Sequence, residues 1–428
     1  MPLEHHPQRA YLHEEIHSRP QPEIAVPAAV SFLLLLAGEA EVDRAREALA
    51  DLCRRYGAAP PHGERYFAAQ LGELEVRWEQ HTEFFTLTFV RTLVDPAQPF
   101  AETAIELVPK DWLDALPGQV LTAAHIALVP DVGTWRPADI AVLFEGQRVS
   151  ASRVSGGAAA IWTAFRPHGD GFVRYLLAGR EISRARAGRL VQRIVETESY
   201  RMMALLGLPV ARRNSLELRR MEERLAEQVA RIGAVRDLAG EKALLDELFA
   251  LAAAAERMVA ETEYRFRATA AYGQLVADRF RELKAERLDD YQPLAEFLER
   301  RFEPALRTCR SIQERQVALE ERIARTANLA RTRVFVELER QNQELLASMD
   351  RRARLQLRLQ ETVEGLSVAA ISYYFVGLLA YALKPPMKEL GLSLGGSELV
   401  IAALTPFVVL AVWWGMRQTR KRLHDRES

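Results

Sequence analysis

Two histidines near the N-terminus have the types and spacing of a catalytic zinc site. His13 and His17 flank Glu14 in the pattern H-E-x-x-H. On a helix, positions i and i+4 place both imidazoles on one face, where they can bind zinc while the glutamate acts as a general base. Pro20 limits such a helix to a short segment, and no third ligand follows at a familiar spacing. We therefore predict that the protein is not an enzyme and binds no metal or cofactor, with a zinc peptidase as a remote alternative.

A second set of polar residues recurs with helical spacing near the C-terminus. Ser367, Tyr374 and Tyr381 stand seven residues apart. Gly377 and Lys384 each follow one of these tyrosines by three positions. This spacing places three hydroxyl groups, a glycine without a side chain and a cation on one stripe of a helix. Because polar groups in a membrane helix usually face protein or water, the stripe predicts a helix-packing face or, in a ring of copies, the lining of a pore.

A third set interrupts an otherwise apolar helical segment at residues 190–208. Glu198 and Arg201 stand at positions i and i+3, where opposite charges meet on a helix. The spacing predicts an ion pair on the helix surface. The alternative is a ligand-contacting or interdomain site that also includes Tyr200.

The composition excludes several classes of function. The chain has 428 residues, and 57 basic residues against 58 acidic ones give it a net charge of -1, which offers no field for drawing in nucleic acid. Glycine-rich phosphate loops and the G-x-S-x-G nucleophile pattern are absent from the sequence. Cys53 and Cys309 match neither the spacing of metal ligands nor a disulfide framework. Cysteines without disulfides are typical of proteins in a reducing cytoplasm.

Two long uncharged segments predict a membrane anchor. Residues 366–383 and 399–416 contain no charged side chain over 18 positions each, close to the minimum that spans a bilayer. Arginine and lysine cluster before the first segment and after the second. The positive-inside rule then places both termini on the cytoplasmic side of the membrane. A buried hairpin of a soluble protein is the alternative.

Residues 25–180 show the patterns of an α+β domain. Apolar and polar residues alternate over 74–79 and 85–89, which predicts a hairpin of two strands with one solvent-exposed face. Turn signals at 155–157 and 168–171 predict a further antiparallel meander. Helical periodicity at 41–56 and near 111–116 predicts helices that cover the sheet.

Residues 181–365 are dominated by alanine, leucine, glutamate and arginine with helical spacing. Breaks are expected at Pro209, Gly233, Pro293 and Pro304. Beyond the last of these, one helix is expected to continue into the first membrane span. A heptad-like seam runs along it at Leu319, Ile323, Ala330, Val334, Leu338, Leu345 and Met349. Such a helix cannot bury its seam alone, so it must pack on earlier helices, on other copies, or on both.

Three segments together resemble an uncharacterised family of bacterial membrane-anchored proteins over essentially the whole chain. They are the early motif at residues 12–20, the helix around 198–202 with its ending at 206–209, and the C-terminus with its two predicted spans. The family's early motif reads H-N-E-L-H-A-R-P, so His13, Glu15, His17, Arg19 and Pro20 match it, while Glu14 replaces asparagine. The resemblance implies that these residues, with Glu198, Tyr200 and Arg201, are contact residues. It implies no activity.

The architecture is also similar to that of the CorA family of divalent-cation channels. That family ends its first span in Y-G-M-N and continues with M-P-E-L, where this sequence has Tyr381-Ala382-Leu383-Lys384 and Met387-Lys388-Glu389-Leu390. The resemblance implies a homo-oligomer with an ion pathway. Lysine in place of asparagine would repel a cation at the pore entrance.

The sequence thus predicts an α+β cytoplasmic domain, a long and mostly α-helical stalk or coiled-coil region, and a two-helix transmembrane hairpin. The predicted parts are an N-terminal segment (1–24), the α+β domain (25–180), the stalk (181–365), the first span (366–383), an external loop (384–398), the second span (399–416) and a basic tail (417–428). The partners expected are the lipid bilayer and other copies of the chain, with an ion or a cytoplasmic protein as further candidates. The leading function is ion transport, and the alternative is a non-conducting membrane-anchored scaffold or regulator that binds a cytoplasmic partner.

Overall fold

The computed structural model of the chain describes residues 5–9, 12–13, 22–131, 135–235, 237–389 and 394–424. Within these ranges, the side chains of residues 383–398 and 419–424 are not described. The chain divides into two compact units. The first unit comprises residues 1–234 and 244–327, and the second comprises residues 235–243 and 328–428.

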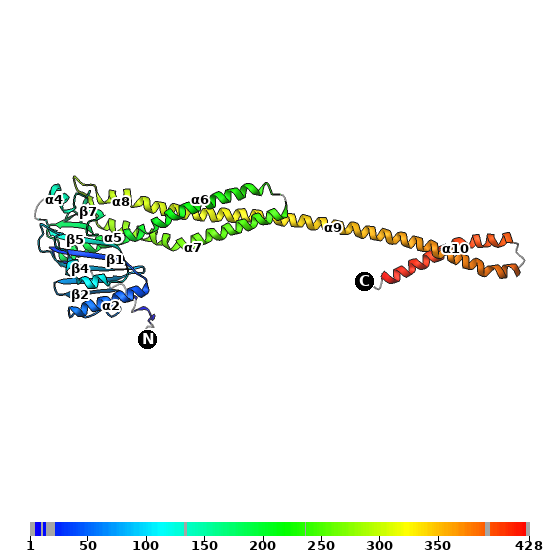
Figure 1. The fold of residues 1–428 in the computed structure, drawn as a ribbon, viewed down its shortest axis with the longest axis horizontal. Helices are drawn as coiled ribbons and strands as arrows, with labels where there is room; N and C mark the ends of the chain where they lie inside the picture. The colour runs from blue at the N-terminus through cyan, green and yellow to red at the C-terminus, as the bar shows by residue number, and fades with distance from the viewer. Residues whose placement is uncertain are drawn as a thin grey trace. The chain divides into compact units, whose positions relative to one another are not determined.

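The first unit is built on a mixed sheet that has nine strands in the described residues (Figure 1). In spatial order the strands are β2 (Tyr66–Leu71), β3 (Leu74–Gln80), β4 (Phe84–Thr92), β1 (Ala28–Leu36), β5 (Gln119–Pro130), β8 (Val173–Gly179), β7 (Ala159–Pro167), β6 (Ser150–Val154) and β9 (Glu286–Arg287). Strands β5 and β8 run parallel, whereas the other named pairs are antiparallel. The hairpin predicted at 74–89 is β3–β4, and the predicted meander is β6–β7–β8.

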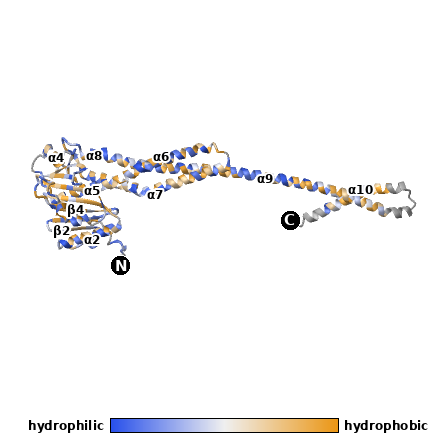
Figure 2. Ribbon diagram, viewed as in Figure 1, coloured by the Kyte–Doolittle hydropathy of each residue, from blue (hydrophilic) through white to orange (hydrophobic). Residues whose placement is uncertain are grey.

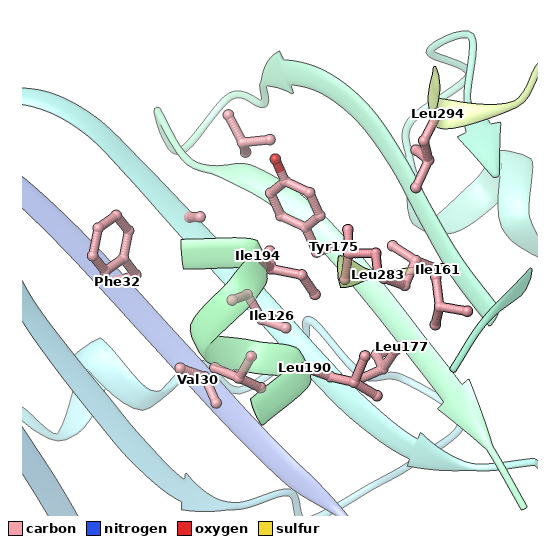
Figure 3. Packing of buried hydrophobic residues seen from close by; sticks show 14 of the residues in the cluster. Val30, Phe32, Ile126, Ile161, Tyr175, Leu177, Leu190, Ile194, Leu283 and Leu294 are labelled. Atoms are coloured by element: carbon pink, nitrogen blue, oxygen red, sulfur yellow. The ribbon is translucent and has the colours of Figure 1, made fainter. Parts of the chain in front are cut away.

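One face of the sheet is covered by α5 (Arg184–Leu205). In β1, Val30, Phe32 and Leu34 point to this face because successive strand side chains alternate. Leu190 and Ile194 of α5 pack on them and on the central strands (Figure 3). The C-terminal part of α7 (Leu238–Glu282), the residue that follows it and α8 (Leu294–Arg301) contribute to the same core through Val276, Leu283, Leu294 and Leu298.

The opposite face has two separate groups of covering elements. Helix α2 (Glu39–Arg55), the turn η1 (Ala104–Leu107) and α3 (Lys110–Asp114) cover the half formed by β1, β3 and β4. The stripe predicted for α2, namely Ala45, Leu49 and Leu52, is fully buried there. Helix α4 (Pro137–Leu143) covers the half near β7 and β8. The sequence prediction of an α+β domain is therefore confirmed, as a sheet with helices on both faces.

The chain reaches this sheet through a close contact between Pro22 and α5. A Cβ placed on Gly188 would lie 1.7 Å from the Pro22 carbonyl oxygen, so only glycine allows the two backbones to approach. Ile24 N–H donates to the Arg184 carbonyl at 3.1 Å. The segment that follows the early sequence motif is thus anchored on α5.

Long helices follow α5. They are α6 (Gly207–Ile232), α7, α8 and α9 (Glu303–Glu389). The expected prolines lie at or just inside helix starts, where no internal hydrogen bond is lost: Pro209 in the first turn of α6, Pro293 before α8 and Pro304 in the first turn of α9. In the first unit, α9 packs on α6 and α7, since Arg315 pairs with Glu222 at 2.8 Å and Gln316 donates to Thr262 at 3.2 Å.

The second unit contains the C-terminal part of α9 and α10 (Leu394–His424). Both helices are long and apolar enough to cross a membrane. Hydrophobic residues dominate the described part of α10 (Figure 2). Helix α9 continues beyond Lys384, where the sequence predicted the external loop to begin, and ends at Glu389. Pro385 and Pro386 lack the N–H groups that would donate to the carbonyls of residues 381 and 382, so the last part of α9 forms without these two hydrogen bonds.

Candidate functional site

Part of the predicted stripe comes together on the surface of α9. Tyr374, Gly377 and Tyr381 line one hollow of about 480 Å³, and the two tyrosines are 71% and 82% exposed. Ser367 does not line it and donates instead to the Val363 carbonyl of its own helix at 2.8 Å. The side chain of Lys384 lies outside the described residues. The side chains that the structure describes thus leave the two tyrosines of the stripe uncovered.

The polar residues of α5 form a buried network between that helix and the sheet. Glu198 is fully buried and accepts hydrogen bonds from Arg201 Nη2 at 2.6 Å, from Tyr175 Oη at 2.6 Å and from Thr122 Oγ1 at 2.9 Å. The Arg201 guanidinium also lies over the Phe165 ring, 5.6 Å from its centre. The predicted ion pair between Glu198 and Arg201 is present, but its predicted place on the helix surface is wrong.

The location of this pair determines its chemistry. Burial acts to raise the pKa of the Glu198 carboxyl, but the adjacent Arg201 charge and three hydrogen bonds overcome that effect and hold the pKa below its ordinary value. Burial, reinforced by the Glu198 charge, holds the pKa of Tyr175 well above its ordinary value, so this phenol stays protonated. Glu198 accepts hydrogen bonds from all three of these neighbours and is shielded from water. It therefore positions α5 on the sheet and is not available as a catalytic base.

Tyr200, the remaining residue of this predicted set, lies apart from the pair. Its ring stacks on Tyr272 of α7 at a centroid distance of 5.8 Å. Tyr272 in turn donates to Glu83 at 3.2 Å, and Glu83 also pairs with Arg265. These contacts fix α7 to the turn between β3 and β4. The role of Tyr200 is therefore to join helices to the sheet.

The early motif is described only at its first residue. His13 lies within the described residues, whereas Glu14, Glu15, His17 and Arg19 lie outside them. Among the side chains that the structure describes, no group of three or more His, Cys, Asp and Glu residues could hold a metal ion. The predicted contact residues of the motif and the residues of the zinc-peptidase alternative, His13 excepted, thus lie outside the described residues.

A cluster of titratable side chains that the sequence did not predict lies on the face of the sheet opposite α5. We call it the acid–imidazole cluster; it consists of His125, Glu145, His168, Asp170 and Arg174. Arg174 bridges the two carboxylates, with Nη2 at 3.0 Å from Glu145 and at 3.4 Å from Asp170. His168 Nδ1 lies 3.2 Å from Glu145, and His125 Nε2 lies 4.0 Å from Asp170.

The buried end of this cluster is held in one protonation state. His125 stacks on Phe172 at 4.0 Å, and its Nδ1 lies 3.0 Å from Ser31 Oγ. Burial lowers the pKa of His125 to about 4, against the smaller effect of Asp170. His125 is therefore neutral at physiological pH. Since Ser31 Oγ accepts from the Ile105 N–H at 3.0 Å, its hydroxyl hydrogen is available to donate to His125 Nδ1.

The other end of the cluster opens into a cleft of about 940 Å³, which we call the Phe100 cleft. Glu145 and Arg174 line it, and the Arg174 guanidinium lies 5.3 Å from the centre of the Phe100 ring. Asp95 and Asp139 add carboxylates to the lining. Arg174 donates to the Leu143 carbonyl and to both carboxylates of the cluster, so its donors are largely committed within the fold.

No curated protein and no solved structure matches the chain. Residues 4–423 match the protein family described as "Protein of unknown function (DUF3422)", so the described sheet, the long helices and both apolar helices all lie within the match. The chain belongs to this uncharacterised family, as the sequence motifs indicated.

Proposed function

We propose that this chain is an integral protein of the bacterial inner membrane that assembles with copies of itself and transports ions. In this proposal α9 and α10 form a transmembrane hairpin, both termini are cytoplasmic, and the first unit lies in the cytoplasm. The architecture is proposed to be similar to that of the CorA family.

The observation that carries the membrane assignment is the exposure of both apolar helices. Within the described residues, only 6% of the apolar window of the helix containing the first span is buried, and 0% of that of the second. A soluble protein would lose about 25 cal/mol for each Å² of apolar surface left in water. A soluble hairpin would bury these windows in its own core, whereas a lipid bilayer covers them without further protein.

The observation that supports self-assembly is the seam on α9. Leu319 and Ile323 are each 1% exposed, because earlier helices cover them. Further along the same seam, Leu345 and Met349 are 61% and 59% exposed. The seam continues here with the same spacing, but the described part of the chain does not cover it. A second copy of α9 has the matching spacing to pack against it.

Cysteine crosslinking tests this assembly. In membranes, Leu345→Cys is expected to give at least fivefold more disulfide-linked dimer than Ala347→Cys, because position 347 lies on the opposite side of the helix from positions 345 and 349. The native cysteines Cys53 and Cys309 are buried and serve as an internal background. Equal crosslinking at both positions would remove α9 as the interface.

Ion flux tests the transport role. Purified protein in liposomes is expected to pass at least one of Mg²⁺, K⁺ and Cl⁻, and Tyr381→Leu is expected to change that flux severalfold, because Tyr381 is 82% exposed on the stripe. Phe407→Leu, an exposed position of α10, serves as the control and should leave the flux unchanged.

The second candidate function is a non-conducting membrane-anchored scaffold or regulator that binds a cytoplasmic partner. The specific observation in its favour is the Phe100 cleft in the first unit, with Val142 78% exposed in its lining. Absence of flux for all three ions, in wild-type protein that is correctly inserted, would exclude transport and leave this candidate.

A further inference from the structure

A second cleft of the first unit lies where the two parallel strands end. Strands β5 and β8 run side by side, and their carboxyl ends lead into Asp131 and Arg180. Both residues line a cleft of about 520 Å³, which we call the Trp162 cleft. Carboxyl ends of adjacent parallel strands are common ligand positions, because the chain leaves the sheet there and its side chains converge.

Small and aromatic residues line the Trp162 cleft. The small ones include Gly157, Ala159, Ala160, Ala178 and Gly179. The aromatic ones are Trp135, Trp162 and Tyr291. The rings of Trp162 and Tyr291 are nearly perpendicular, at 83°, with centroids 6.5 Å apart. Two aromatic groups at right angles form a corner, and the small residues leave space beside it.

The polar groups of Trp162 and Tyr291 interact with each other. Trp162 is 6% exposed, and its indole N–H donates weakly to the Tyr291 oxygen, which acts to lower the pKa of that phenol against the larger, raising effect of burial. The hydrogen of the Tyr291 hydroxyl has no acceptor of normal hydrogen-bond geometry among the residues that the structure describes. A buried hydroxyl of this kind is uncommon unless water or a ligand completes it.

The charges at the rim are unequal. Asp131 and Arg180 neutralise each other at 3.3 Å. Asp289 and Asp290 also line the cleft, and across the described ranges neither carboxylate has an ion-pair partner within 4 Å. Arg153, the remaining cation in the lining, stands on β6 opposite Glu286 of β9. The uncompensated charge next to the aromatic corner is therefore negative.

We propose that the Trp162 cleft binds a small organic ammonium cation that carries an oxygen acceptor. The face of an aromatic ring attracts a cation, and the attraction grows as water is excluded. Asp289 and Asp290 supply the counter-charge, while the Tyr291 hydroxyl can donate to the ligand's oxygen. The cleft lies outside the acid–imidazole cluster and the proposed membrane spans, so this site is independent of ion transport.

Calorimetry on the full-length protein in detergent tests the proposal with choline as the probe. Its uncharged isostere 3,3-dimethylbutan-1-ol has the same shape and hydroxyl group. Choline is expected to bind at least tenfold more tightly than the isostere, because only choline carries the charge that the rings and carboxylates recognise. No choline binding, or equal binding of both compounds, would overturn the proposal.

A charge-neutralising variant locates the site. Asp289→Asn with Asp290→Asn is expected to weaken choline binding at least tenfold. Asp290 has a φ of 69°, which asparagine also adopts readily, and both side chains are at the surface, so the variant should fold. Asp246→Asn, an exposed position on α7, is the matched control and should bind as wild type. Unchanged affinity in the double variant would place choline elsewhere and overturn the assignment.

Discussion

Replacing Glu198 by alanine is expected to lower the free energy of unfolding by about 3 to 5 kcal/mol. The Arg201 side chain is only 10% exposed, and its partner Glu198 is 1% exposed. Without the carboxylate, a buried guanidinium keeps its charge but loses its counter-charge, and Tyr175 and Thr122 each lose a hydrogen-bond acceptor. The change is measured as a fall in the urea midpoint of the detergent-solubilised protein, followed by circular dichroism.

An exposed pair of the same composition provides the control. Glu321 and Arg325 lie 3.4 Å apart on α9, with side chains 63% and 67% exposed. Glu321→Ala is expected to cost at most about 0.5 kcal/mol, because water screens the pair. Removing the unpaired Arg201 charge as well, in the double variant Glu198→Ala with Arg201→Met, should recover much of the lost free energy of unfolding. A double variant no more stable than Glu198→Ala would show that the unpaired charge is not the cause.

The parts of the fold that the sequence predicted are those that depend on local periodicity. Alternation over 74–79 and 85–89 predicted the two strands that the structure shows as β3 and β4, and the stripe at Ala45, Leu49 and Leu52 predicted the buried face of α2. The order of strands across the sheet was not predictable in this way. Strand β1 pairs with both β4 and β5, and β5 with β8 in parallel, through contacts far apart in the sequence.

The same distinction applies to the candidate sites. The i, i+3 spacing of Glu198 and Arg201 predicted a pair, but its burial depends on Tyr175 and Thr122, which lie 23 and 76 residues from Glu198. The acid–imidazole cluster joins residues from four separate segments, so no sequence motif predicts it. In the sequence, His168 and Asp170 indicated only a turn. Spacing along one helix predicts which side chains meet, but tertiary packing decides whether water reaches them.

The two sides of the sheet therefore differ in packing and in the surroundings of their charged groups. On the α5 side, hydrogen bonds to Glu198 and Glu83 hold the long helices to the sheet. On the other side, the acid–imidazole cluster and both clefts lie beside α4, where apolar cover is incomplete. A ligand in either cleft would contact the sheet without disturbing the network that positions the helices.

Lowering the pH from 7 to 5 is expected to cost about 2 kcal/mol of stability through His125 alone, and about 3 kcal/mol by pH 4. Burial lowers its pKa from an ordinary 6.5 to about 4. Between these values the unfolded chain binds a proton that the folded protein does not, so the stabilisation is complete above pH 6.5 and falls until about pH 4. Asp170, Arg174 and His168 are the charged or titratable groups that face the ring.

His125→Gln isolates this effect, because glutamine has no proton to gain in this range and can still accept from the Ser31 hydroxyl. Urea midpoints of the two proteins are compared at pH 7, 6 and 5. The wild type should lose stability with a steeper slope than the variant across this window. The lowered carboxyl pKa values of Asp170 and Glu198 act only at lower pH, since their ordinary values are 3.8 and 4.5. Parallel pH profiles of the two proteins would show that His125 binds its proton as readily in the folded chain as in the unfolded one. The imidazole beside Ser31 would then not be held in its neutral form.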